Sequence, residues 1–153
     1  MKKIAFMVAV LTISATPAFA VTGPVTFTGT VTATCSLMVN SNGTMTPSAD
    51  LKNVSSKNSG ASGASVGITS TGNVSLKVDP VASATIPAAD ITPTTWKPTY
   101  SMSGVQTIAN TGNATPITVP GSGVVTVHLE GTKGASDSFV PGLYSAVVTV
   151  RCE

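Results

Sequence analysis

The stretch VTFTGTVTATCSL, residues 25–37, decides the fold prediction because it alternates without interruption. Apolar or small side chains occupy every odd position, and threonine or serine occupies every even position. A period of two is typical of a β-strand with one buried face, and valine and threonine both favour strands. We therefore predict a strand over residues 25–37, with Cys35 on its apolar face.

The C-terminal segment, residues 143–152, has the same period. Its even positions are apolar from Tyr144 to Cys152, whereas its odd positions mix Leu143 and Val147 with polar residues. We expect a last strand that is covered on both faces. Both cysteines of the chain thus lie in phase with an apolar strand face.

Shorter strands are predicted between these two segments. They are a hairpin over residues 65–78 with its turn at 71–73, a weaker pair over residues 97–108, and a strand over residues 124–130 with Val125, Val127 and Leu129 inward. Residues 53–65 are low in complexity and predict a loop. Because no amphipathic helix is apparent, the expected fold class is all-β, arranged as a β-sandwich.

Charge is scarce along the whole chain. Of its 153 residues only 9% are charged, and the length suits one domain. Without Lys2 and Lys3, which lie in a predicted leader, the six remaining basic residues equal the six acidic ones. Such a balance lacks the basic field that holds nucleic acid or an anionic membrane. It also leaves few titratable groups for catalysis, so we expect no enzyme.

Residues 1–20 combine Lys2 and Lys3 with an apolar stretch and the ending Ala18-Phe19-Ala20. These are the parts of a secretory signal peptide, and the apolar stretch is too short to span a bilayer. We expect cleavage after Ala20, export to a periplasm and no insertion into a membrane.

Export changes the interpretation of the two cysteines. In an oxidising compartment an even count favours a disulfide, here between Cys35 and Cys152, and two free thiols are the alternative. A structural zinc site needs four ligands, whereas the chain has two cysteines and one histidine. We expect neither a metal nor a cofactor.

Few residues are candidates for chemistry. His128 alternates outward with Glu130, which permits either a His–Glu pair that serves a serine hydroxyl or a solvated strand face. No Gly-x-Ser-x-Gly turn accompanies it, and the solvated face is the preferred interpretation. Trp96 and Tyr100 are candidate ligand contacts because aromatic rings stack on sugars, although such residues also fill sandwich cores.

Both ends of the expected mature chain resemble one family. The start VTGPVTFTGTV, residues 21–31, followed by Cys35, resembles that of chaperone–usher pilins, in particular the archaic, spore-coat-protein-U-like branch. The ending PGLYSAVVTV, residues 141–150, is similar to that family's last strand, a Gly-x-Tyr followed by alternating valine and threonine. The resemblance covers the first fifteen and last dozen mature residues, and the middle only in character.

The resemblance implies an immunoglobulin-like β-sandwich that lacks its seventh strand. The implied limits are a signal peptide over 1–20, an N-terminal extension or first strand over 21–34, and the sandwich domain over 35–153. The extension would enter the groove of a neighbouring copy through four donor-strand residues, Val25, Phe27, Gly29 and Val31.

The family usually pairs its first cysteine with one in a nearby strand, whereas residues 74–78 contain none. The position of Cys152 next to the end of the chain also departs from the family pattern. The pairing of the family's disulfide and its C-terminal contact with a chaperone are therefore not carried over to this chain.

The resemblance implies a non-catalytic structural subunit of a surface fimbria, a structure of cell adhesion, assembled by donor-strand exchange. Its partners would be other copies or related subunits, a periplasmic chaperone and an outer-membrane usher, and its route the periplasm and then the cell surface. The alternative is a self-contained exported β-sandwich that binds a carbohydrate or protein through its loops. In that case residues 25–37 are its own first strand.

Overall fold

A computed structural model describes residues 24–153, and the signal peptide expected over residues 1–20 lies outside this range, as do residues 21–23. The chain divides into two units after Thr30, and residues 31–153 form the larger one. The described residues contain twelve strands and no helix, so the all-β prediction is confirmed.

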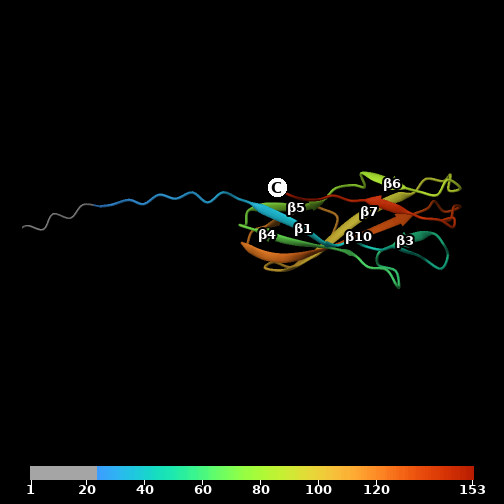
Figure 1. Cartoon of the computed structure of the whole chain (residues 1–153), viewed down its shortest axis with the longest axis horizontal. Helices are drawn as coiled ribbons and strands as arrows, with labels where there is room; N and C mark the ends of the chain where they lie inside the picture. The colour runs from blue at the N-terminus through green and yellow to red at the C-terminus, as the bar shows by residue number, and fades with distance from the viewer. Residues whose placement is uncertain (1–23) are drawn as a thin grey trace, which may run out of the picture. The chain divides into compact units, whose positions relative to one another are not determined.

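One sheet is built around the long central strand β10 (Gly121–Thr132) (Figure 1). β10 pairs along one side with β7 and along the other with β4 and then β3, while β1 pairs with β4, β2 with β3 and β8 with β7. The remaining members are β1 (Cys35–Ser41), β2 (Thr46–Pro47), β3 (Asn53–Ser55), β4 (Ala64–Ser70), β7 (Thr95–Gly104) and β8 (Ile108–Thr111). A strand pair is thus present near the predicted range 97–108, but β7 occupies the range up to Gly104 and β8 only begins at Ile108.

A second layer is formed by β5 (Val74–Val78), which lies between β9 (Thr115–Ile117) and β12 (Val150–Cys152). A two-stranded ribbon joins β6 (Ser83–Thr85) to β11 (Ser145–Val147). Because β6 follows β5 and β11 precedes β12, the ribbon continues the pairing of β5 with the C-terminal strand. All of these pairs are antiparallel.

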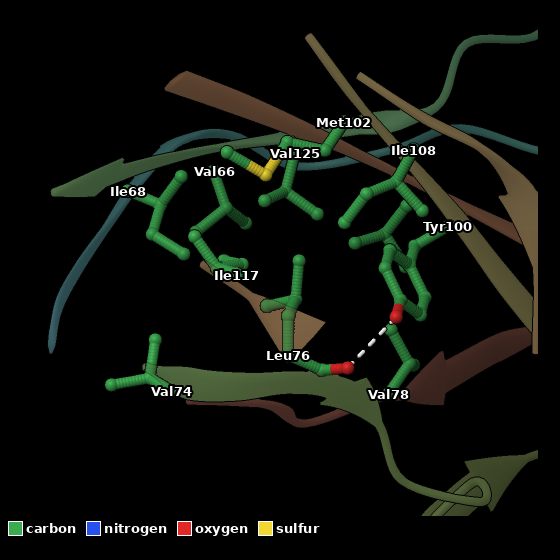
Figure 2. Packing of buried hydrophobic residues seen from close by; sticks show 11 residues of the cluster. Val66, Ile68, Val74, Leu76, Val78, Tyr100, Met102, Ile108, Ile117 and Val125 are labelled. Atoms are coloured by element: carbon green, nitrogen blue, oxygen red, sulfur yellow. Dashed lines mark hydrogen bonds between the residues drawn. The ribbon is translucent and has the colours of Figure 1, made fainter. Parts of the chain in front are cut away.

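The core lies between the two layers (Figure 2). Side chains from β4, β7, β8 and β10 meet those from β5 and β9, in a cluster of Val66, Ile68, Val74, Leu76, Val78, Tyr100, Met102, Ile108, Ile117, Val125 and Val127. The Tyr100 hydroxyl lies 2.8 Å from the carbonyl oxygen of Leu76, so it links the layers by a hydrogen bond as well. This packing is consistent with the predicted β-sandwich. Val125, Val127 and Leu129 point inward as expected.

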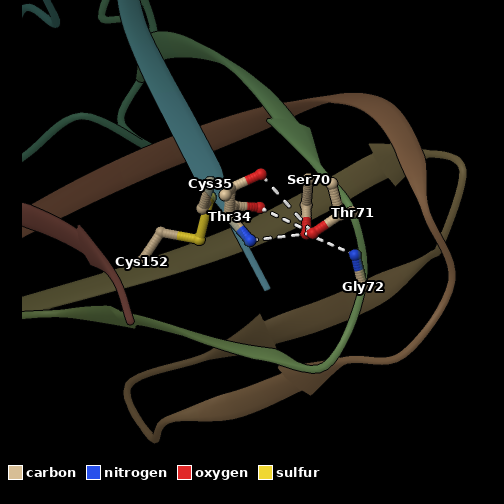
Figure 3. Close-up of a disulfide and its surroundings, with 6 residues drawn as sticks. All are labelled: Thr34, Cys35, Ser70, Thr71, Gly72 and Cys152. Carbon is tan, nitrogen blue, oxygen red and sulfur yellow. Dashed lines mark hydrogen bonds between the residues drawn. A yellow bond between two sulfur atoms is a disulfide. The ribbon is translucent and has the colours of Figure 1, made fainter. Parts of the chain in front are cut away.

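The predicted disulfide between Cys35 and Cys152 is present (Figure 3). It joins β1 of the first sheet to β12 of the second, with 6.0 Å between the two Cα atoms. The bond therefore ties the first and last strands across the two layers of the fold.

The strand predicted over residues 25–37 begins only at Cys35 and continues to Ser41. Its ladder with β4 starts where Cys35 pairs with Ser70, the last residue of β4. Immediately before it, the Thr34 backbone N–H donates to the Thr71 hydroxyl at 2.7 Å (Figure 3). Residues 24–34 form no strand, and the ladder between β1 and β4 begins only at Cys35.

The hairpin predicted over residues 65–78 is wrong. β4 and β5 both exist, but they belong to different sheets, and residues 71–73 carry the chain across. Left-handed backbone at Gly72 (φ 84°) and Asn73 (φ 56°) makes the crossing. Alternation alone did not distinguish the two arrangements, because either one buries Val66 and Leu76.

Two further expectations differ from the structure. Residues 53–65 begin with β3 and end with the start of β4, so the predicted loop is confined to residues 56–63, and Val54 is buried where β3 pairs with β10. The last strand is split into β11 and β12 and is covered on one face only. Leu143 and Val147 on its other face are exposed, because no described element packs over that side.

The loop between β10 and β11 is held by a buried ionic network. Lys133 and Asp90 form an ion pair of 2.7 Å whose side chains are 0% and 1% exposed. Tyr144 donates its hydroxyl proton to Asp90 and accepts a hydrogen bond from the Val140 N–H at 3.2 Å. Hydrogen bonds from Lys133 and Tyr144 hold the pKa of the Asp90 carboxyl well below its usual range. The network fixes where the last strand begins.

Replacing Tyr144 with Phe removes the hydroxyl that serves Asp90 and Val140. We expect the free energy of unfolding to fall by about 1–3 kcal/mol, the cost of leaving buried polar groups unpaired. Urea denaturation measures the change, and Ser145→Ala, at an exposed neighbouring position, is the matched control. Equal stability of the Tyr144→Phe and Ser145→Ala variants would contradict this role.

Replacing both Cys35 and Cys152 with Ser opens a loop that spans 117 residues of sequence separation. Chain entropy predicts a loss of about 5 kcal/mol, because the unfolded chain regains its freedom. Chemical denaturation of the double variant, beside the parent protein with and without reductant, measures this loss. An unchanged unfolding midpoint would show that the disulfide contributes nothing to stability.

Candidate functional site

The last strand leaves one of its edges without a partner among residues 24–153. On its paired edge, the Thr149 carbonyl accepts from the Asp79 N–H at 2.9 Å and the Val147 carbonyl accepts from the Ala82 N–H at 3.0 Å. Backbone groups alternate between the two edges of a strand. Those of Ala146, Val148 and Val150 therefore point to the open edge.

The first strand has a comparable open edge. β1 pairs with β4 on one side and with no other described strand. Leu37 of β1 and Val148 and Val150 of the last strand are only partly buried against the core. Two open edges, one in each layer, are thus joined at one end by the disulfide and share the partly covered margin of the core.

Residues 24–34 include the residues that the family resemblance implies for a donated strand. Val25, Phe27 and Val31 are 77%, 91% and 87% exposed, and these residues form no strand. A Cβ atom built on Gly29 would meet nothing within 4 Å. Val25, Phe27, Gly29 and Val31 are therefore accessible, in a segment whose backbone has no strand partner.

An apolar cavity of about 380 Å³ lies at the start of the last strand. Leu143 and Tyr144 contribute from the C-terminal segment, and Met45 and Pro47 contribute from the segment that includes β2. β2 follows β1 along the chain, so the cavity lies between continuations of the two open edges, at the end away from the disulfide. The sequence did not indicate this cavity, because its walls come from distant segments.

Neither Trp96 nor Tyr100, the two candidates for ligand contact, has an exposed side chain on which a sugar could stack. Tyr100 is completely buried, and its hydroxyl is directed to the Leu76 and Asn113 carbonyl oxygens. Trp96 is half-buried and lies over Gly131, where a Cβ would come within 2.5 Å of the indole ring. Both rings pack within the fold, the second of the two interpretations given for them.

His128 projects from the outer face of β10 into a smaller cavity of about 110 Å³. Its Nδ1 lies 3.1 Å from the hydroxyl oxygen of Ser56, a contact that the sequence did not predict because 72 positions separate the two residues. Ser56 is buried and accepts a hydrogen bond from the Leu129 N–H. This geometry ties the segment after β3 to β10 and does not present a serine hydroxyl to a substrate.

Burial, and then the positive charge of Lys57, lower the pKa of His128. Because the folded state disfavours the protonated ring, the contribution of His128 to folding stability is fully present above the ordinary pKa of the unfolded chain. It is lost as the pH falls from that value through the lowered pKa of the folded state. The imidazole is therefore uncharged at neutral pH.

Within residues 24–153, no three His, Cys, Asp or Glu side chains converge to hold a metal ion. The same part of the chain contains no helix that is long and apolar enough to cross a membrane.

His128 is the single histidine of the chain, so its proton resonance is unambiguous. We expect its titration midpoint to lie below 6.5. Lys57→Gln should raise the midpoint part of the way, because burial remains after the charge is removed. NMR titration of the Cε1 proton measures both values, and Lys77→Gln, at a distant ion pair, is the control. An unperturbed midpoint would contradict the described environment.

Comparisons with protein-family models, with curated proteins and with solved structures give no match to this chain.

Proposed function

We propose that this protein is a structural subunit of a surface fimbria, in which the N-terminal extension of one copy completes the sandwich of the next. The observation that carries the proposal is the pair of open strand edges, one in each layer, together with an accessible alternating segment that has no strand partner. An open edge and a partly covered core attract another chain, and an added strand satisfies both.

The strand order supports a sandwich that lacks one strand. An immunoglobulin constant-type domain has the order A-B-E-D in one sheet and G-F-C in the other. Taking β1, β4, β5, β7, β10 and β12 as A to F, the observed neighbours are A-B-E-D and F-C. The position of strand G, beside the last strand, has no occupant among the described residues.

Tyr144 supports the same architecture. In immunoglobulin-like folds a tyrosine at the corner between strands E and F directs its hydroxyl back to the backbone a few residues upstream. Tyr144 precedes β11 after the turn from β10, and its hydroxyl contacts Val140, four residues upstream.

The alternation of the extension matches the open edge of the last strand. Residues directly opposite in an antiparallel pair place their side chains on the same face. Ala146, Val148 and Val150 have half-buried side chains and backbone groups at the open edge. A donated strand that placed Val25, Phe27 and Val31 opposite such residues would direct all three side chains to the core.

The direction of the last strand also determines how copies would be arranged. It runs from the apolar cavity at Leu143 to the disulfide at Cys152. An antiparallel donor would enter at the disulfide end and leave at the cavity, so its own body, which begins near Cys35, would lie beyond the cavity. Repeating this head-to-tail contact generates an open filament.

The energy of such a contact is sufficient. Three buried apolar side chains contribute about 1.5–3 kcal/mol each, and several backbone hydrogen bonds about 1 kcal/mol each. The total is of order 10 kcal/mol, comparable with the stability of a whole domain. Assembly would thus complete folding, and until then a periplasmic chaperone and an outer-membrane usher would cover the open edges.

Deleting residues 21–30 tests the proposal. We expect a subunit that no longer polymerises but binds a synthetic peptide of residues 21–34, with a gain in thermal stability. Both follow because the deletion removes the donor and leaves the acceptor edges open. Size-exclusion chromatography and thermal denaturation measure the two effects, and the same peptide with Phe27→Asp is the matched control.

The full-length Phe27→Asp variant tests the same contact without a deletion. It should fail to polymerise, whereas Thr28→Asp, whose side chain would point outward, should not. If the full chain is a stable monomer and the deletion unfolds it, the alternative holds, and the protein is a self-contained sandwich that binds a carbohydrate or protein ligand.

A further inference from the structure

In the part of the chain that the structure describes, two basic side chains that form no ion pair lie together on the outer face of the first sheet. Residues 24–153 contain six basic side chains, Lys52, Lys57, Lys77, Lys97, Lys133 and Arg151. Lys77, Lys133 and Arg151 each form an ion pair with an acidic residue. Lys52 donates to the backbone carbonyls of Ala135 and Asp137. The remaining two, Lys57 and Lys97, form no ion pair among the described residues, and both line the cavity beside His128.

Four separate elements build this cavity. Lys97 and Thr99 come from β7, His128 and Glu130 from β10, Asn110 from β8, and Lys57 from the segment after β3. Thr99 is paired with His128 and Lys97 with Glu130 in the β7–β10 register. The Lys57 ammonium contacts the Asn110 side-chain oxygen at 3.3 Å. Pairing of β7 with β10 and with β8 fixes the backbone positions from which Lys97, Asn110 and Glu130 project, and the Lys57 side chain contacts Asn110.

The polar side chains of the cavity differ in whether they donate or accept hydrogen bonds. The two lysines only donate hydrogen bonds, the ionised Glu130 only accepts them, and Asn110 does both. Glu130 is held by the Asn53 amide at 3.3 Å rather than by a lysine, so both ammonium groups keep donors for another anion. The charges of these three side chains sum to one positive charge, since His128 is neutral, and favour a single negative charge on a ligand.

We propose that this cavity binds an acidic saccharide, with the sugar carboxylate at Lys57 and Lys97 and neighbouring hydroxyls donating to Glu130 and bonding to Asn110. A compact dianion such as phosphate would be repelled by Glu130 more strongly than a sugar carboxylate with its single charge. A neutral sugar would leave both lysines unpaired. The volume of about 110 Å³ admits a carboxylate with its adjacent hydroxyls, and the rest of the sugar ring projects outward.

Ligand-observed saturation-transfer NMR on the full chain tests the proposal, because it detects ligand binding to the monomer and to the polymer alike; all ligands are compared on one sample. The probe is methyl β-D-glucuronide, with the neutral methyl β-D-glucoside and sodium acetate as comparisons. We expect saturable transfer to the ring protons of the glucuronide and weaker binding of both comparison ligands. Absence of transfer, or equal binding of the glucoside, would overturn the proposal, as would acetate that competes at equal concentration.

Variants locate the site. Lys57→Gln combined with Lys97→Gln should weaken glucuronide binding by roughly tenfold or more, as expected for the loss of charge-assisted hydrogen bonds. Lys77→Gln removes the same kind of charge elsewhere and should have no effect. Equal losses in the two cases would indicate diffuse charge attraction and overturn the site.

Glu130→Gln separates a saccharide site from a general anion site. It should weaken the glucuronide, whose hydroxyls exchange two charged acceptor oxygens for one neutral amide oxygen, and strengthen acetate, which loses a repulsive neighbour. Strengthening of both ligands would overturn the role of the hydroxyls. Circular dichroism confirms that each variant is folded, and the single lysine variants repeat the test where the double one is not.

Discussion

The disulfide between Cys35 and Cys152 is the constraint on which the arrangement of the edges depends. It holds the first strand of one sheet against the last strand of the other, with Cα atoms 6.0 Å apart. No backbone ladder connects these two strands, since each pairs only with its own sheet among the described residues. The bond closes one end of the margin between the layers and leaves the other end, at the apolar cavity, open.

An open margin is costly for a small domain with few aromatic residues. The core is formed mainly by aliphatic side chains and by Tyr100, whose hydroxyl joins the layers. Its margin at Leu37, Val148 and Val150 is only partly covered, and unpaired backbone groups lie along it. A donated strand would satisfy both the apolar side chains and the backbone. The cavity beside His128, lined by Lys57 and Lys97, lies on the outer face of β7 and β10. A ligand there and a donated strand at the open edges would therefore occupy different surfaces.

Strand predictions from alternation alone were correct where the alternating segment also has a neighbouring strand to pair with. β10 and the inward face of the last strand lie where the period of two predicted them, whereas β8 begins where the predicted pair ended. The same pattern failed at residues 25–34, which alternate equally well but have no neighbouring strand, and at residues 65–78, where both strands exist in different sheets. The sequence also did not predict the contact between Ser56 and His128, because 72 positions separate these two residues.

The sequence by itself determined that the chain is all-β, which residues face the core in most strands, and that both cysteines lie in phase with apolar strand faces. These properties follow from side-chain chemistry and from a period that each residue shares with its near neighbours. Only the tertiary structure decided which strands are neighbours, where the edges stay open, and that two lysines lie at one cavity. Those features depend on hydrogen bonds and contacts between distant segments, and a local period carries no information about such contacts.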